Sequence, residues 1–167
     1  ALMQGTMGVE SSVGSGSLFW FELPLQPVES DIRSPLDKRI RFQRQRVLVI
    51  EPHPVDRQLI DDYLTRWNLS PTLASSRESG ITMLNHAKNN GQPFDLLLVA
   101  EDLPDSRGSK VIQVIHRLSQ FVALPAILMQ NLGQPLAIEP APGVEAPLIQ
   151  KPLRIEQLLL SIESALG

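Results

Sequence analysis

The stretch FDLLLVAEDLPDSRG, residues 94–108, is the part of the chain that decides the fold. It begins with an apolar run that ends at Val99, of the kind that is buried on both faces of a parallel sheet. A loop that contains Pro104 and Gly108 follows this strand. A helix is predicted after the loop from apolar residues at helical spacing, namely Val111, Ile112, Val114, Ile115 and Leu118. One strand followed by one helix is the repeating unit of an α/β protein.

The same unit recurs on both sides of this stretch. RVLVIEPHPVDRQLI, residues 46–60, predicts a first strand over 46–50 and a helix over 55–67. A short strand over 71–74 and a helix over 76–88 form the second unit. Residues 124–129 and 148–150 supply the fourth and fifth strands, and residues 155–166 the last helix. The expected fold is α/β, a doubly wound five-stranded parallel sheet with right-handed crossovers.

The segment NLGQPLAIEPAPGVEAP, residues 131–147, interrupts this pattern. It contains four prolines, each of which removes a backbone donor and opposes a helix interior: Pro135, Pro140, Pro142 and Pro147. A regular fourth helix is therefore not expected. The segment and the neighbouring last helix are predicted to form an interaction surface, with the apolar residues Leu132, Leu136, Ile138 and Val144. A solvent loop whose apolar residues only cap the core is the alternative.

Residues 46–167 resemble the receiver domain of two-component response regulators, a flavodoxin-like or CheY-like fold. RVLVIEPHPVDRQLI is similar to the family's first strand, acidic pair and opening helix. FDLLLVAEDLPDSRG is similar to its phosphorylation strand and loop, and LIQKPL, residues 148–153, to its terminal Lys-Pro. Three motifs in register make the resemblance fairly specific.

The resemblance implies a site that has lost its chemistry. In the family, an acidic pair and an aspartate hold magnesium, and that aspartate accepts the phosphoryl group. The pair corresponds here to Glu51 and Pro52, and the acceptor to Ala100, whose methyl group is no nucleophile. We therefore expect no catalytic residue, no metal and no cofactor. The family's switch hydroxyl and aromatic correspond to Gln130 and Leu148, so the conformational relay is also expected to be absent.

Lys151 corresponds to the family lysine that contacts the phosphoryl oxygens, and Lys151–Pro152 to a bond that is cis in the family. Without a phosphoryl group, Lys151 is expected either to pair with Glu51 or to be solvated, and the sequence leaves both open. Glu101 and Asp102 follow the acceptor position directly. Because adjacent residues that leave a strand point to different sides, neither is expected to replace the aspartate. Both are interpreted as solvated loop acids.

Residues 1–25 resemble the carboxy-terminal end of a histidine-kinase ATP-binding domain, where a helix end leads into a hairpin. The quoted match, LMQGTMGVESSVGSGSLFWFELPL, places the turn at Gly14-Ser15-Gly16 before an aromatic strand. The glycines are interpreted as turn residues only. An expression linker is the alternative, which the aromatic strand disfavours. The expected organisation is thus a kinase remnant over 1–25, a linker over 26–45 and a pseudo-receiver domain over 46–167.

Composition excludes several classes of protein. A net charge of −3 with 43% hydrophobic residues describes a globular protein and not a nucleic-acid binder. There is no cysteine, and the histidines (His53, His86, His116) are too dispersed for a metal motif. The absence of cysteine fits a cytoplasmic location. No apolar run is long enough to span a bilayer, so the fragment is not expected to be membrane-embedded, although its parent could be membrane-anchored. The linker carries a basic excess, interpreted as solvated, with an anionic ligand as the alternative: Arg33, Lys38, Arg39, Arg41 and Arg44.

Three functions are therefore compared. The leading hypothesis is a non-phosphorylatable pseudo-receiver of a hybrid sensor histidine kinase, which is itself no enzyme and docks on its own kinase module or on another two-component protein. The second is a sensor domain that binds a nucleotide or cyclic dinucleotide near the linker arginines or the altered fourth crossover. The third and least favoured is a divergent phosphotransfer enzyme that uses Glu101, Asp102 or His53.

Overall fold

The computed structural model describes residues 4–25, 42–133 and 146–167. These residues fall into two compact units, a hairpin and an α/β domain. The hairpin pairs β1 (Thr6–Ser12) with β2 (Gly16–Glu22) in antiparallel register. Its turn holds Gly14 and Gly16 at φ +82° and +92°, values that side chains oppose, so the turn role of these glycines is confirmed.

The second unit contains five parallel strands. They are β3 (Arg46–Ile50), β4 (Ser70–Ala74), β5 (Leu96–Ala100), β6 (Ala126–Asn131) and β7 (Leu148–Lys151). Their order across the sheet is β4-β3-β5-β6-β7, so the chain starts near the middle and winds outward in both directions. The predicted doubly wound parallel sheet is confirmed.

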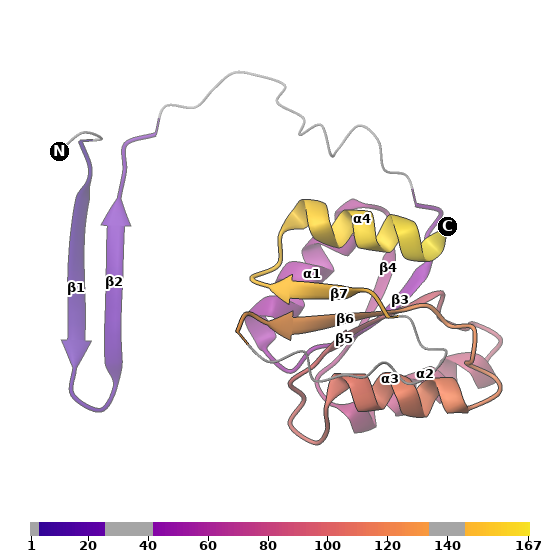
Figure 1. Cartoon of the computed structure of the whole chain (residues 1–167). Coiled ribbons are helices and arrows are strands. Elements are labelled where there is room, and N and C mark those ends of the chain that lie inside the picture. The colour runs from indigo at the N-terminus through magenta and orange to yellow at the C-terminus, as the bar shows by residue number, and fades with distance from the viewer. Residues whose placement is uncertain (1–3, 26–41, 134–145) are drawn as a thin grey trace. The chain divides into compact units, whose positions relative to one another are not determined.

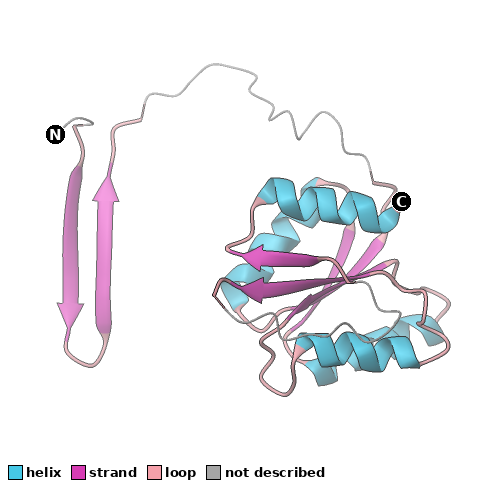
Figure 2. Ribbon diagram, in the orientation of Figure 1, coloured by secondary structure: helices cyan, strands magenta, loops and turns pink. Residues whose placement is uncertain are grey.

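Three helices connect these strands in the described part of the domain, α1 (Pro54–Arg66), α2 (Arg77–Asn89) and α3 (Gly108–Arg117), and a fourth, α4 (Ile155–Leu166), follows β7. Helices α1 and α4 cover one face of the sheet, and α2 and α3 cover the other (Figures 1 and 2). Residues 134–145 lie outside the described ranges, so the expected absence of a helix there stays a prediction. Within the described ranges, no helix is both long and apolar enough to cross a lipid bilayer.

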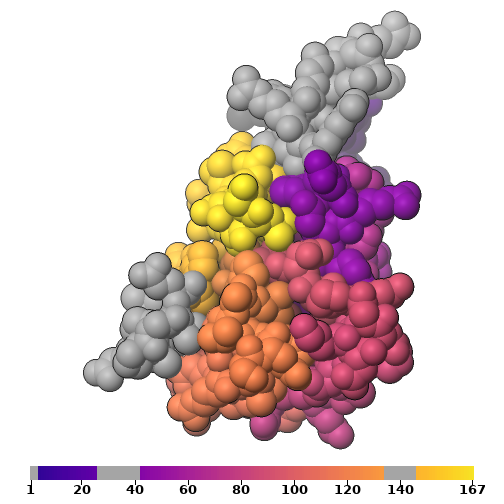
Figure 3. Space-filling view, turned by 90° about the vertical axis from the view of Figure 1, so that its right-hand side faces the viewer, coloured from indigo at the N-terminus to yellow at the C-terminus, as the bar shows by residue number. Residues whose placement is uncertain are grey.

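The core lies between the three interior strands, β3, β5 and β6, and the helices on both faces of the sheet. Every side chain of β5 is buried, and β3 is buried after Arg46. Such strands cannot alternate apolar and polar residues, which explains the continuous runs in the sequence. The space-filling view shows α4, in yellow, lying at the surface beside the first described residues of the domain, in purple (Figure 3).

Candidate functional site

The predicted site residues gather at the carboxyl edge of the sheet. Glu51 follows β3, Ala100 is the last residue of β5, and Lys151 is the last residue of β7. Strand pairing aligns these ends, because Ile50 pairs with Val99 and Ala100 with Met129. Parallel sheets bring the carboxyl ends of their strands to one edge, where ligands of this fold class bind.

Lys151 lies between two carboxylates at this edge. Its Nζ donates to Oε2 of Glu51 at 2.6 Å and to Oδ2 of Asp56 at 2.9 Å. The Glu51 side chain is 1% exposed and that of Lys151 13% exposed. The expectation of pairing with Glu51 is confirmed, and the alternative of a solvated lysine is wrong. Sequence reasoning missed Asp56, whose place in the first turn of α1 was the available signal.

The loop between β3 and α1 holds Glu51 in this position. The backbone N–H of His53 donates to Oε1 of Glu51 at 3.1 Å. The Arg57 guanidinium donates to the backbone oxygens of Glu51 and Pro52 at 2.6 and 3.0 Å. The Glu51 carboxylate therefore has a partner on each oxygen, which a buried charge requires.

Lys151 is a charged group in a partly buried place. Burial acts to lower its pKa, but the hydrogen bonds and the charges of Glu51 and Asp56 outweigh burial, so the pKa of Lys151 is raised above 10.5. The ammonium is accordingly charged at neutral pH. With two carboxylates facing one ammonium, the cluster formed by Glu51, Asp56 and Lys151, here called the lysine cluster, carries excess negative charge.

Ala100, which the resemblance aligns with the phosphoacceptor, is buried at the end of β5. Pro52, which follows Glu51 and corresponds to the second member of the acidic pair, is half-buried and has no side-chain oxygen. No group of three or more histidine, cysteine, aspartate or glutamate side chains within the described ranges is arranged to hold a metal ion. The expected loss of the phosphoacceptor and of the metal ligands stays a prediction.

The burial of Glu101 shows that its interpretation from the sequence was wrong. It was expected to be a solvated loop acid, but it is buried and accepts hydrogen bonds from the backbone N–H and the hydroxyl of Ser109, at 2.8 and 3.1 Å. The physical reason is that Arg107, at the N-cap of α3, makes no side-chain cap. An arginine has no acceptor, so the Glu101 carboxylate stabilises the helix N-terminus instead.

Asp102 and Asp105 lie in the same loop and are exposed, in agreement with the expectation for Asp102. Asp102 nevertheless accepts from the Asn131 amide at 2.8 Å. Asp105 accepts from the backbone N–H groups of Arg77 and Glu78 at the start of α2. Slight burial opposes ionisation of Asp105, but these hydrogen bonds outweigh it and lower its pKa. The loop is thereby tied to both β6 and α2.

The two residues that correspond to the family's switch residues, Gln130 and Leu148, lie on β6 and β7. Gln130 is buried near the end of β6, and Leu148, the first residue of β7, is half-buried against the core. His53 is exposed, and its Nδ1 lies 3.9 Å from Asp56. Neither strand position supplies the hydroxyl or the aromatic ring that the family resemblance would require.

The predicted interaction residues are only partly described. Leu132 follows β6 and is 70% exposed, whereas Leu136, Ile138 and Val144 lie outside the described residues. Of the basic linker residues, Arg44 alone lies within the described ranges. The hypothesis of a surface over 131–147 therefore stays a prediction.

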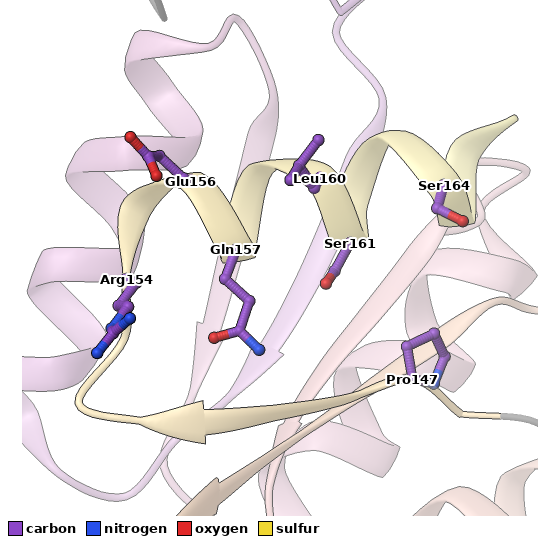
Figure 4. A pocket seen from close by; sticks show the side chains of 7 residues that line it. All are labelled: Pro147, Arg154, Glu156, Gln157, Leu160, Ser161 and Ser164. Carbon is purple, nitrogen blue, oxygen red and sulfur yellow. The ribbon is translucent and has the colours of Figure 1, made fainter.

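An open groove of about 610 Å³ runs along α4 (Figure 4). Its lining residues come from α4, from the turn before that helix and from the residue before β7: Pro147, Arg154, Glu156, Gln157, Leu160, Ser161 and Ser164. The lining has one cation and one carboxylate with hydroxyl and amide groups. It is separate from the lysine cluster.

Comparison with known proteins finds one similar protein sequence and several solved structures of similar fold. A scan against models of known protein families gives no match. The chain is similar to the sensor histidine kinase AruS of Pseudomonas aeruginosa, with 27% identity over 158 residues that cover 92% of this chain and 15% of that kinase. The chain thus spans a small part of the length of the curated relative it matches.

Several solved structures are similar to this chain in fold. A sensor protein from Polaromonas sp. JS666 has a TM-score of 0.66 at 21% identity, over 74% of this chain and 96% of that one. A response regulator receiver domain protein from Clostridium thermocellum has 0.63 at 20%, over 73% and 94%. The chemotaxis response regulator CheY4 of Vibrio cholerae has 0.61 at 19%, over 72% and 98%. Together with the strand order and the paired helix layers, this likeness shows that residues 46–167 have the fold of the response regulator receiver domains of two-component signalling.

Proposed function

We propose that this domain is a non-phosphorylatable pseudo-receiver that regulates a hybrid sensor histidine kinase by protein–protein docking. The observation that carries the proposal is the lysine cluster beside Ala100. Lys151 already has two carboxylate partners, at 2.6 and 2.9 Å, and the residue at the acceptor position has no nucleophilic atom. The fragment itself is then no enzyme, and the kinase activity belongs to the parent chain.

The electrostatics of the lysine cluster support this function. A phosphoryl group at this edge would need a divalent cation and a free cation to offset its charge. At this edge Lys151 is already paired with Glu51 and Asp56 and is not a free cation, and Pro52 contributes no ligand. Two of the three N–H donors of Lys151 are already used by Glu51 and Asp56, so few remain for an incoming phosphate. The arrangement therefore favours a fixed internal ion-pair network over phosphoryl binding.

Two further observations support a parent of the hybrid-kinase type. The curated relative is named as a sensor histidine kinase, and its match covers 92% of this chain. The hairpin over residues 6–22 also fits the end of a kinase ATP-binding domain, as its sequence predicts. The partner would be the kinase module of the same parent or another two-component protein. The exposed Leu132 marks the start of the proposed docking surface over 131–147.

Incubation of residues 1–167 with acetyl phosphate and magnesium is expected to leave the intact mass unchanged. Magnesium with beryllofluoride is likewise expected to leave the amide resonances around Glu51 and Ala100 in place. The reason is that Pro52 and Ala100 remove two of the three carboxylates that a receiver uses. A saturable, magnesium-dependent set of amide shifts would overturn the proposal, and a gain of one phosphoryl group would favour phosphotransfer through Glu101, Asp102 or His53.

The single variant Ala100→Asp is the control for this experiment. It restores a carboxylate at the acceptor position, but Lys151 remains paired and Pro52 still supplies no oxygen. Gln130 and Leu148 also still lack the groups of the relay. We expect no phosphorylation-driven conformational change in this variant. If it both accepted phosphate and changed conformation, the site would not be degenerate in the way proposed.

Deletion of residues 46–167 from the parent is expected to change its autophosphorylation rate by about fivefold or more, the lower range of allosteric coupling. The rate would be measured with radiolabelled ATP in full-length and truncated proteins. Leu132→Asp in the full-length parent should give part of the same change, because it alters the proposed docking surface and not the core. An unchanged rate after the deletion would contradict a regulatory role.

The groove along α4 favours ligand sensing as a second candidate function. Arg154 offers one cation, and Gln157, Ser161 and Ser164 offer polar groups to an anionic ligand. A screen of nucleotides and cyclic dinucleotides by thermal shift separates this function from docking, because a ligand that binds the folded state raises the melting temperature. Loss of that shift in Arg154→Ala would assign the ligand to the groove.

A further inference from the structure

Two residues with left-handed backbone angles are hydrogen-bonded to each other where the α/β domain begins. Arg44 has φ +59° and Asn68 has φ +63°, values that most side chains oppose. The backbone N–H of Arg44 donates to the carbonyl oxygen of Asn68 at 3.1 Å. Such angles persist only where the surrounding contacts hold them, so the contacts around this pair indicate what the strain serves.

Helices α1 and α2 end in the same way, which provides a comparison within the chain. After each helix, a residue in the left-handed conformation and the residue that follows it donate back to carbonyl oxygens of the last turn, as in a Schellman motif. The left-handed residue is Gly91 after α2, with φ +69°, and Asn68 after α1. Glycine is the usual residue at this position because it has no Cβ. An asparagine there therefore indicates a use for its side chain.

The side chain of Asn68 binds a segment that is distant in sequence. Its Nδ2 donates to the carbonyl oxygen of Phe42 at 2.7 Å, across 26 residues. A glycine at position 68 could adopt the same backbone angle, but it could not make this bond. Asn68 therefore ends α1 and also holds the chain that precedes β3.

Further contacts hold the same four residues, 42–45, here called the arm. The backbone N–H of Ser70 donates to the carbonyl oxygen of Gln45 at 2.9 Å, where the pairing of β3 with β4 begins. The backbone N–H of Gln43 donates to Oε1 of Gln45 at 2.7 Å. Phe42 is half-buried and packs against the core. The arm thus belongs to the α/β domain by its contacts, although it lies in neither a helix nor a strand.

We propose that Asn68 is a latch that holds the arm on the turn between α1 and β4 and so fixes where the linker leaves the domain. The arm, which the sequence analysis assigns to the linker, is then the first part of the domain. This attachment lies at the amino edge of the sheet, opposite the lysine cluster. In the parent, the domain acts on the kinase module through this fixed attachment, and that step rests on the proposed function. The latch itself does not.

Trypsin cleavage after Arg44 measures how often the arm opens, because a protease needs locally unfolded backbone. In residues 1–167, Asn68→Gly is expected to cleave there on the order of fivefold faster than the wild type, the effect of losing one hydrogen bond. Mass spectrometry of the fragment that begins at Gln45 gives the rate. Glycine adopts a φ of +63° without strain, so the melting temperature should not fall with it.

A matched variant and an internal control exclude other causes. Asn68→Asp keeps the size and shape of the side chain, but a carboxylate cannot donate to the carbonyl oxygen of Phe42. It should raise the cleavage rate after Arg44 at least as much as Asn68→Gly. Cleavage after Arg117, at the end of α3 on the other face of the sheet, should not change in either variant. Equal cleavage rates after Arg44 in the wild type and both variants would overturn the latch.

The consequence for regulation is measured in the full-length parent. Asn68→Gly should shift the autophosphorylation rate toward that of the protein without residues 46–167. If the deletion changes this rate and Asn68→Gly does not, the attachment does not carry the coupling and the inference fails. If the deletion itself has no effect, the proposed function fails, and the trypsin experiment still decides whether the latch exists.

Discussion

Lys151→Met is expected to lower the free energy of unfolding of the α/β domain by about 3–5 kcal/mol, the usual cost of removing one partner of a buried ion pair. The reason is that Glu51 is 1% exposed and would retain a charge without its ammonium partner. Methionine keeps most of the lysine stem, so packing changes little. Urea unfolding followed by circular dichroism measures the difference.

Two variants control for other causes of this loss. Lys151→Met combined with Glu51→Leu should regain most of the lost stability, because no unpaired charge then remains. Asp56→Asn should cost much less, since the Asp56 side chain is 35% exposed and water can replace its partner. A loss below about 1 kcal/mol in Lys151→Met would contradict the importance of the lysine cluster.

The pH dependence of stability gives a second measure of the same interaction. The pKa of Lys151 is raised in the folded state, so the folded state binds the proton more tightly than the unfolded state. The stabilisation is fully present below the ordinary lysine value of 10.5 and is lost as the pH rises through the raised value. The wild-type protein should therefore lose stability in this alkaline range more steeply than Lys151→Met.

Gly108→Ala is expected to cost about 3 kcal/mol, at the upper end of the usual range for overpacking. A Cβ on Gly108 would overlap the carbonyl oxygen of Ala100 and lie 2.8 Å from its carbonyl carbon. Backbone cannot rotate away as a flexible side chain can, so α3 would have to move off the end of β5. That movement would also disturb the Glu101 carboxylate, which accepts from Ser109 in the first turn of α3. Thermal and urea unfolding measure the loss.

Gly91→Ala provides the matched control, with the same change at a glycine of another kind. Gly91 has φ +69° and nothing within 4 Å of an added Cβ, so only backbone strain of about 1–2 kcal/mol is expected. The Glu101–Ser109 contact should survive in this variant. If Gly108→Ala were no more destabilising than Gly91→Ala, close approach of α3 to β5 would not be what requires a glycine at 108.

Periodicity and apolar runs in the sequence predicted the fold well. The run over 46–50 coincides with β3, and the predicted last helix over 155–166 coincides with α4. The strand predicted over 94–99 is instead Leu96–Ala100. Phe94 is buried but precedes the strand, and the side chain of Asp95 accepts from the backbone N–H of Arg46. Burial alone therefore does not fix a strand boundary.

The sequence by itself determined that residue 100 is alanine and residue 52 is proline, neither of which has a side-chain oxygen, because these facts depend on residue identity alone. Only the tertiary structure decided how the remaining charges are satisfied. Lys151 lies 100 residues after Glu51 and 95 after Asp56, so no local pattern could select between pairing and solvation. Likewise, the sequence predicts that Glu101 is a solvated loop acid. In the folded chain α3 lies close to the end of β5, which Gly108 permits, and this position of α3 buries the Glu101 carboxylate. The spacing of residues along a strand determines which face of the sheet each side chain points to. The partner of a charged side chain, in contrast, comes from elements that are distant in sequence and meet only in the folded chain.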